Sequence, residues 1–255
     1  MPAPLVFVHG WSVNAGVWEA QTEHFEDKFQ VHTFTFPGHG DEPPVEGTLT
    51  IQRLGNLLAR MLDAKDLRGA HLVGWSMGAQ VAIHAADMAK ERVRSLTIVG
   101  GTPCFTAPAP DAKWATPLTK SKWFYRSMKS DYQNSLRDFI MRFFEAEKEL
   151  GSDGAERIKH LFFDRHFPPD ERSALELLDD LMVSDIRALA ATITLPSLIV
   201  HGAHDRIVPV EVTGLWGELL RPSGTEVIAG CGHAPFISFP ELFNRRLETF
   251  LEGLR

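Results

Sequence analysis

Cysteine is scarce in this chain: 255 residues contain only Cys104 and Cys231. The two lie far apart, which excludes the dense disulfide framework of small secreted proteins. Neither cysteine has metal-ligand spacing, and no histidine pair has a third ligand nearby. We therefore expect two free thiols in a reducing compartment, and neither a metal nor another cofactor.

Positive charge and long apolar segments are also lacking. The net charge is −7, whereas a nucleic-acid-binding protein normally shows a basic surface. No apolar run approaches the roughly 20 residues that span a bilayer, and no basic segment precedes the first apolar stretch. These absences predict a cytoplasmic protein without a nucleic-acid or membrane partner.

Short apolar strands instead alternate with helical segments over much of the chain. We expect the strands at residues 5–9, 31–36, 70–73, 95–99, 196–201 and 225–228. Helical periodicity covers 17–25 and 51–62, and a final helix is expected from about 240 to 251. Strands that are apolar throughout, separated by helices, predict an α/β fold with a mostly parallel sheet and helices on both faces.

The alternation stops near Pro108. Between there and Ile193 the sequence is charged and helical and contains no expected strand. We therefore predict a helical cap over residues 109–185, inserted between two parts of one core at 1–108 and 186–255.

The segment Gly74-Trp75-Ser76-Met77-Gly78 stands between an apolar strand and a helix-favouring run. A serine between two glycines at a strand-to-helix turn is the pattern of the nucleophile elbow, whose strained backbone leaves no room for neighbouring side chains. This context predicts that Ser76 is a nucleophile. A serine here also argues against dehalogenase and epoxide hydrolase chemistry, which use aspartate at this position.

A serine hydroxyl needs a base within hydrogen-bond reach and a third group that orients the base. In this architecture the chain order is serine, acid, histidine. Asp205 and His233 follow two later strands in that order. The loop after the strand that follows the elbow contains no acid, which favours Asp205. The alternative is that Asp205 is a turn residue or helix cap and His233 an ordinary loop histidine.

The oxyanion of an acyl-transfer reaction needs two backbone N–H donors. We expect one from Met77, directly after the nucleophile, and one from Trp11 in the loop after the first strand; the Trp11 ring would line the acyl pocket. We interpret His9 as a brace for that loop, and His39 and His201 as structural.

The predicted cap has an uneven charge. Between residues 113 and 142 stand seven basic side chains and two acidic ones, a net of +5. This region is either a solvated helical face or a landing site for an acidic partner or substrate. Aromatic residues either form an apolar ceiling under the cap or belong to its core: Trp123, Phe124, Phe139, Phe143 and Phe144.

Together these residues resemble the α/β-hydrolase superfamily over nearly the whole chain. Within it, four groups of residues resemble the pimeloyl-[acyl-carrier protein] methyl ester esterases of biotin synthesis. They are Val8-His9-Gly10-Trp11 with Asn14-Ala15 and Val17-Trp18, Gly74-Trp75-Ser76-Met77-Gly78, Pro103-Cys104-Phe105, and His233-Ala234-Pro235-Phe236-Ile237-Ser238.

The resemblance implies a role for each matching position. The implied site residues are the nucleophile Ser76, the acid Asp205, the base His233, the oxyanion donors Trp11 and Met77, and the acyl-pocket residue Phe139. In that family basic cap residues bind the acidic carrier protein, which here implies Arg126, Arg137 and Arg142.

The function implied by the resemblance is that of a monomeric serine carboxylesterase. It would hydrolyse the methyl ester of pimeloyl-acyl carrier protein in biotin biosynthesis, without a cofactor. Two alternatives stay open: a broad-specificity hydrolase of small esters or carbon–carbon bonds, and a non-catalytic ligand-binding member of the fold.

Overall fold

The computed structural model describes residues 2–149, 153–164 and 169–254. Its centre is one six-stranded sheet in the order β2-β1-β3-β4-β5-β6, and all its neighbouring strands pair in parallel. The strands are β1 Pro4–Val8, β2 Gln30–Phe34, β3 Ala70–Trp75, β4 Val93–Val99, β5 Ser197–Gly202 and β6 Gly224–Ile228. The α/β fold with a parallel sheet is therefore confirmed.

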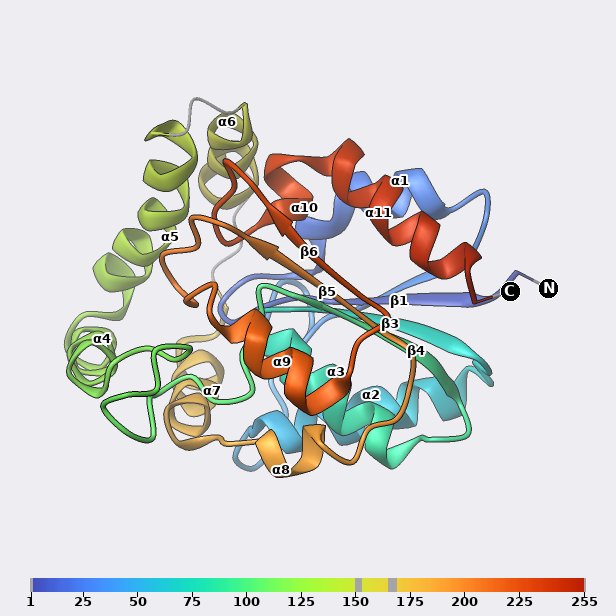
Figure 1. Ribbon diagram of the computed structural model, residues 1–255. Helices are drawn as coiled ribbons and strands as arrows, with labels where there is room; N and C mark the ends of the chain where they lie inside the picture. The colour runs from blue at the N-terminus through green and yellow to red at the C-terminus, as the bar shows by residue number, and fades with distance from the viewer. Residues whose placement is uncertain (1, 150–152, 165–168, 255) are drawn as a thin grey trace.

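Helices cover both faces of this sheet (Figure 1). Helices α1 (Glu19–Phe25) and α11 (Pro240–Glu252) lie on one side; α2 (Ile51–Ala64), α3 (Met77–Met88) and α9 (Val212–Leu220) lie on the other. Two short helices, α8 (Arg187–Ala190) and α10 (Pro235–Ser238), complete these layers. Because helices pack on both faces, β1, β3 and β5 are buried along their whole length.

The expected helix at 17–25 is divided into two parts. A 3-10 helix, η1 (Ala15–Trp18), comes first, and α1 continues from it. The side chain of Asn14 caps η1 by accepting a hydrogen bond from the Gly16 amide at 2.8 Å. Because Asn14 is the N-cap, the helical segment begins at Ala15, two residues before the start that the apolar periodicity predicts.

Helices α2 and α3 approach each other closely at Gly55. A β-carbon on Gly55 would lie 2.3 Å from the β-carbon of His84, which no real side chain tolerates. The small residues of α3, including Ala79, Ala82 and Ala85, are buried. This contact packs α2 closely against α3, and α3 begins directly after Ser76.

A helical insertion separates β4 from β5, as expected. It contains α4 (Leu118–Ser130), α5 (Tyr132–Glu149), α6 (Gly154–Lys159), the π-helix η2 (His160–Asp164) and α7 (Glu171–Val183). These helices gather at one end of the sheet, drawn in green and yellow in Figure 1. In the part of the chain that the structure describes, none of the helices is long and apolar enough to cross a membrane.

Buried histidines make the fold sensitive to acid. The His39 side chain is 0 % exposed, and burial lowers its pKa from 6.5 to about 4. Between these values His39 binds a proton in the unfolded chain but not in the folded protein. The free energy of unfolding is therefore highest above pH 6.5 and decreases as the pH falls toward 4. For one such group the slope approaches about 1.4 kcal/mol per pH unit.

We therefore expect His39→Asn to flatten the acid side of the stability profile. Urea unfolding at pH 4.5, 5.5 and 6.5 measures the slope, with the exposed His160→Asn as the control. An unchanged slope in His39→Asn would show that His39 is also protonated in the folded protein.

Candidate active site

Ser76 stands at the turn between β3 and α3 in a strained conformation, with φ 54° and ψ −119°. Its amide donates to the carbonyl of Val99 on the neighbouring strand at 2.9 Å. A β-carbon on Gly74 would lie 2.4 Å from the Gly78 carbonyl oxygen, and one on Gly78 would lie 2.4 Å from that of His9. The two glycines are thus required by close backbone contacts on either side of the serine, as the elbow pattern predicts.

The structure brings Asp205 and His233 together from the loops after β5 and β6. The His233 Nδ1–H donates to Oδ2 of Asp205 at 2.7 Å, and the two side chains are 2 % and 0 % exposed. This bond leaves Nε2 of His233 as the nitrogen that can accept a proton.

The second carboxylate oxygen of Asp205 accepts the amides of Ile207 at 2.8 Å and Val208 at 2.9 Å. Burial raises the pKa of Asp205, but the charges and hydrogen bonds of His233 and His201 outweigh it. The pKa therefore lies well below its usual range, and Asp205 is an anion in the folded protein.

His201 is a contact of this pair that the sequence analysis missed. Its Nε2 lies 3.2 Å from Oδ2 of Asp205 and 3.0 Å from the carbonyl of Val208. Burial lowers the pKa of His201, but the hydrogen bond to Asp205 raises it above the ordinary value. Its place at the carboxyl end of β5, four residues before Asp205, was the available signal; the structural interpretation of His201 did not link it to Asp205.

His233 is held on several sides. The indole N–H of Trp75 donates to its carbonyl at 2.9 Å, and the ring of Phe143 from the cap stacks on its imidazole at 5.3 Å. Gly100, with φ 54°, leaves room for it, since a β-carbon there would lie 2.9 Å from the His233 carbonyl oxygen. The loop after β4 therefore contributes no acid to the site, but its glycine leaves space for His233.

A buried carboxylate from the cap also reaches this loop. Oε1 of Glu147 on α5 accepts the amide of Gly232, next to His233, at 2.7 Å. The two residues are 85 positions apart, and no sequence pattern links them.

Ser76 and His233 line one narrow cavity, whose open volume is about 20 Å³. Trp11 and Met77 line it as well, and Met77 is the first residue of α3. The rest of the lining is mostly apolar and comes from both core and cap: Gly10, Trp75, Gln80, Thr102, Phe105, Phe124, Phe139, Phe143, Leu181, Ile207 and Val208.

The aromatic residues of the cap divide into two groups. Phe124, Phe139 and Phe143 line the cavity, and the Phe139 ring meets that of Trp11 edge to face at 5.7 Å. The expectation for Trp123 was wrong, because its side chain is 59 % exposed. Phe143 is buried and Trp123 is exposed, whereas the sequence predicted that both would be buried, either as an apolar ceiling or in the core of the cap. The side chain of Phe144 lies outside the described residues.

The basic candidates stand on α4 and α5 and do not line the cavity. Arg126 and Arg137 are exposed, and Arg142 is half-buried with its guanidinium 5.3 Å from the centre of the Trp123 ring. Because these arginines lie on the outside of the cap, the basic region can be either a solvated helical face or a docking surface.

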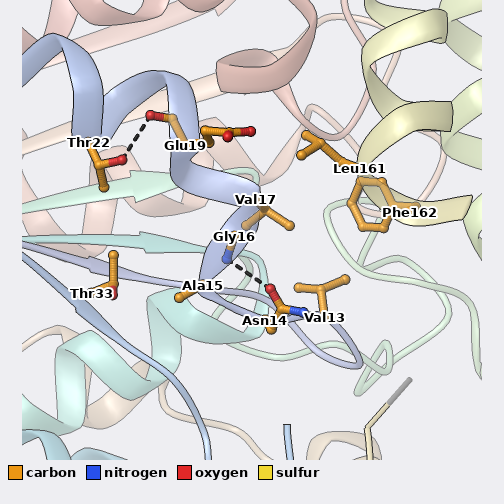
Figure 2. A pocket seen from close by; sticks show the side chains of 10 residues that line it. All are labelled: Val13, Asn14, Ala15, Gly16, Val17, Glu19, Thr22, Thr33, Leu161 and Phe162. Carbon is orange, nitrogen blue, oxygen red and sulfur yellow. Dashed lines mark hydrogen bonds between the residues drawn. The ribbon is translucent and has the colours of Figure 1, made fainter. Parts of the chain in front are cut away.

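A more open hollow lies beside η1 and α1 (Figure 2). Among its described lining residues only Glu19 is ionisable, and Phe162 from η2 closes one side. No serine, cysteine or histidine stands among these described lining residues, so the hollow offers no counterpart to the Ser76 cavity. Within the described ranges, no group of three or more histidine, cysteine or acidic residues could hold a metal ion. Both cysteines are free and buried.

Comparison with known proteins supports one family. The sequence profile described as "Alpha/beta hydrolase family" matches residues 5–246. A protein of Nitrosomonas europaea named pimeloyl-[acyl-carrier protein] methyl ester esterase is 32 % identical over 240 residues, covering 94 % of this chain and 92 % of its own. One of the same name from Edwardsiella ictaluri is 34 % identical, with 98 % and 93 % covered.

Solved structures agree on the fold. The esterase EaEST from Exiguobacterium antarcticum superposes with a TM-score of 0.85 at 20 % identity, covering 98 % of this chain and 92 % of its own. A bromoperoxidase from Bacillus anthracis gives 0.88 at 24 %, with 99 % and 92 % covered. Relatives at this identity support the fold alone, whereas the profile and the full-length relatives establish the family: the chain belongs to the alpha/beta hydrolase family.

Proposed function

We propose that this protein is a serine carboxylesterase. The observation that carries the proposal is that Ser76, at a strained strand-to-helix turn, shares one cavity with His233, whose imidazole is fixed by the buried anion of Asp205 at 2.7 Å. A nucleophile, a base and a group that orients the base are the parts that acyl transfer requires.

In the proposed mechanism, Nε2 of His233 takes the Ser76 proton as Oγ attacks the ester carbonyl. The backbone amides of Trp11 and Met77 donate to the oxyanion, which lowers the barrier because the charge develops where fixed dipoles already stand. The alcohol leaves with the proton from His233. Water, deprotonated by His233, then releases the acid, while Asp205 stabilises the imidazolium in both steps.

The substrate that we propose is the methyl ester of pimeloyl-acyl carrier protein. Two relatives more than 30 % identical over almost their whole length carry that activity in their names. The apolar lining of the cavity, which includes Phe139, suits contact with an acyl chain, and the basic region of the cap suits an acidic carrier. We propose that residues 109–185 form this cap on a core of 1–108 and 186–255, and that the enzyme acts as a cytoplasmic monomer.

The test compares three substrates: the carrier-bound pimeloyl methyl ester, the free pimeloyl methyl ester, and short p-nitrophenyl esters. Cleavage of the carrier-bound ester at a much higher kcat/KM than the free ester would support the proposal. Fast turnover of only the short esters would favour a broad-specificity hydrolase. No turnover of any of them would favour a non-catalytic ligand-binding protein.

Charge reversal on the cap tests the carrier contact. We expect the triple variant Arg126→Glu, Arg137→Glu, Arg142→Glu to lower kcat/KM for the carrier-bound ester by about tenfold or more, because like charges slow encounter and weaken docking. Turnover of p-nitrophenyl esters should be unchanged.

The matched control makes the same change in charge on the core. It combines Arg60→Glu, Lys90→Glu and Arg245→Glu, three exposed positions on or beside α2, α3 and α11. Equal losses in the two triple variants would show that net charge alone is responsible and that the cap has no docking role.

A further inference from the structure

The loop that follows β1 is tied to the cap at two adjacent residues. The indole N–H of Trp11 donates to the carbonyl of Ala174 on α7 at 2.8 Å. The hydroxyl of Ser12 lies 3.2 Å from that of Tyr132, the first residue of α5. Ser12 is 0 % exposed and Tyr132 4 %, so both hydroxyls are removed from water.

Ser12 also has an unusual backbone. Its φ of 58° lies in the left-handed region, which favours glycine and strains a residue with a β-carbon. Such conformations persist only where the surroundings hold them, and they gather at functional sites. Glycine would relieve the strain but would lose the hydroxyl, which is what Tyr132 contacts.

The Tyr132 hydroxyl depends on this contact as well. Among the described residues its hydrogen-bond partner is Ser12 alone. A buried hydroxyl without a partner is costly, so each group stabilises the position of the other. The bond therefore fixes the Ser12 backbone relative to α5, across 120 positions of sequence.

This bond bears on the site because Trp11 lies between Ser12 and Gly10, and because Gly10 and Trp11 line the cavity beside Ser76. A β-carbon on Gly10 would lie 3.2 Å from that of Ser76, so this backbone already lies close to the nucleophile. An oxyanion donor must stand about 2.7–3.1 Å from the position that the developing charge will occupy. Small shifts of this loop would therefore misdirect the Trp11 amide.

We propose that Tyr132 is a positioning residue: through its hydrogen bond to Ser12, the cap holds the Trp11 amide in line with the oxyanion. The inference rests on the proposed esterase function. The cap would then have two roles: it positions an oxyanion donor, and it forms a wall of the acyl cavity. Tyr132 itself acts through Ser12 and touches no reacting atom.

The first test is Tyr132→Phe, which removes the hydroxyl and keeps the ring. We expect kcat for p-nitrophenyl acetate to fall by about tenfold with KM unchanged, because the lost alignment matters most in the transition state. The affinity for phenylboronic acid, which forms a tetrahedral adduct on the serine, should fall by a similar factor. A change that only destabilised the fold would lower the melting temperature and leave the kcat and boronate affinity of the folded enzyme intact.

The chain offers a matched control, since its only other tyrosine is Tyr125 on α4. The hydroxyl of that side chain is also hydrogen-bonded, with Asp179 as the partner, so its removal leaves the Ser12–Tyr132 bond in place. Tyr125→Phe should keep the wild-type kcat and boronate affinity.

Ser12 provides a second test that does not depend on the folding of Tyr132→Phe. Ser12→Gly removes the hydroxyl while relieving the backbone strain, and we expect the same loss of kcat from it. The double variant Ser12→Gly, Tyr132→Phe should lose no more than either single variant, because both remove the same bond.

Wild-type kcat and boronate affinity in Tyr132→Phe and in Ser12→Gly would overturn the inference, and so would fully additive losses in the double variant. Failure of the proposed function would look different, because the wild-type protein itself would then cleave none of the esters.

Discussion

Replacing Ser76 with alanine is expected to reduce the turnover of p-nitrophenyl acetate by at least about 10⁴-fold, because it removes the hydroxyl that forms the acyl-enzyme in the proposed mechanism. Alanine meets the same backbone strain at φ 54° as serine does, so the fold and the cavity should be retained. The measurement is kcat of the purified variant, with its melting temperature as the check on folding.

Ser130→Ala, at an exposed position on α4, serves as the control and should keep full activity. Retention of more than about one hundredth of the wild-type kcat by a folded Ser76→Ala variant would mean that another group is the nucleophile.

The second large effect is expected from Asp205→Asn. Asparagine nearly preserves the shape, but its amide nitrogen is a donor where Oδ2 accepts from Nδ1 of His233. The imidazole then turns to the wrong tautomer and loses the anion that stabilises its charged form. A loss of about 10⁴-fold in kcat follows, as for the equivalent change in other serine hydrolases.

Asp185→Asn is the matched control, because Asp185 also carries hydrogen bonds but pairs with Arg187 instead of a histidine. It should leave kcat unchanged. A loss below about tenfold in Asp205→Asn would contradict the role that we assign to Asp205.

The fold and the placement of the main groups could be predicted because the relevant patterns are local. An apolar strand, a glycine-flanked serine and a small-residue helix stand together within a few positions around Ser76, and parallel topology brings the ends of β5 and β6 to the same edge. This edge is where Asp205 and His233 meet.

Contacts between distant residues could not be predicted in the same way. Tyr132 bonds to Ser12 across 120 positions, and Glu147 to Gly232 across 85. Both depend on how the cap helices rotate over the core, which the spacing of apolar residues does not determine. The same cause explains why Trp123 faces outward while Phe124 faces the cavity.

Covalent trapping tests directly whether Ser76 is the nucleophile. The protein is incubated with diisopropyl fluorophosphate, whose phosphorus is attacked by an activated serine oxygen with loss of fluoride, and the adduct is located by peptide mass spectrometry. We predict one adduct per chain, on Ser76, with a rate that falls sharply in His233→Gln. A folded protein that forms no adduct, or forms it on a residue other than Ser76, would show that Ser76 is not an activated nucleophile.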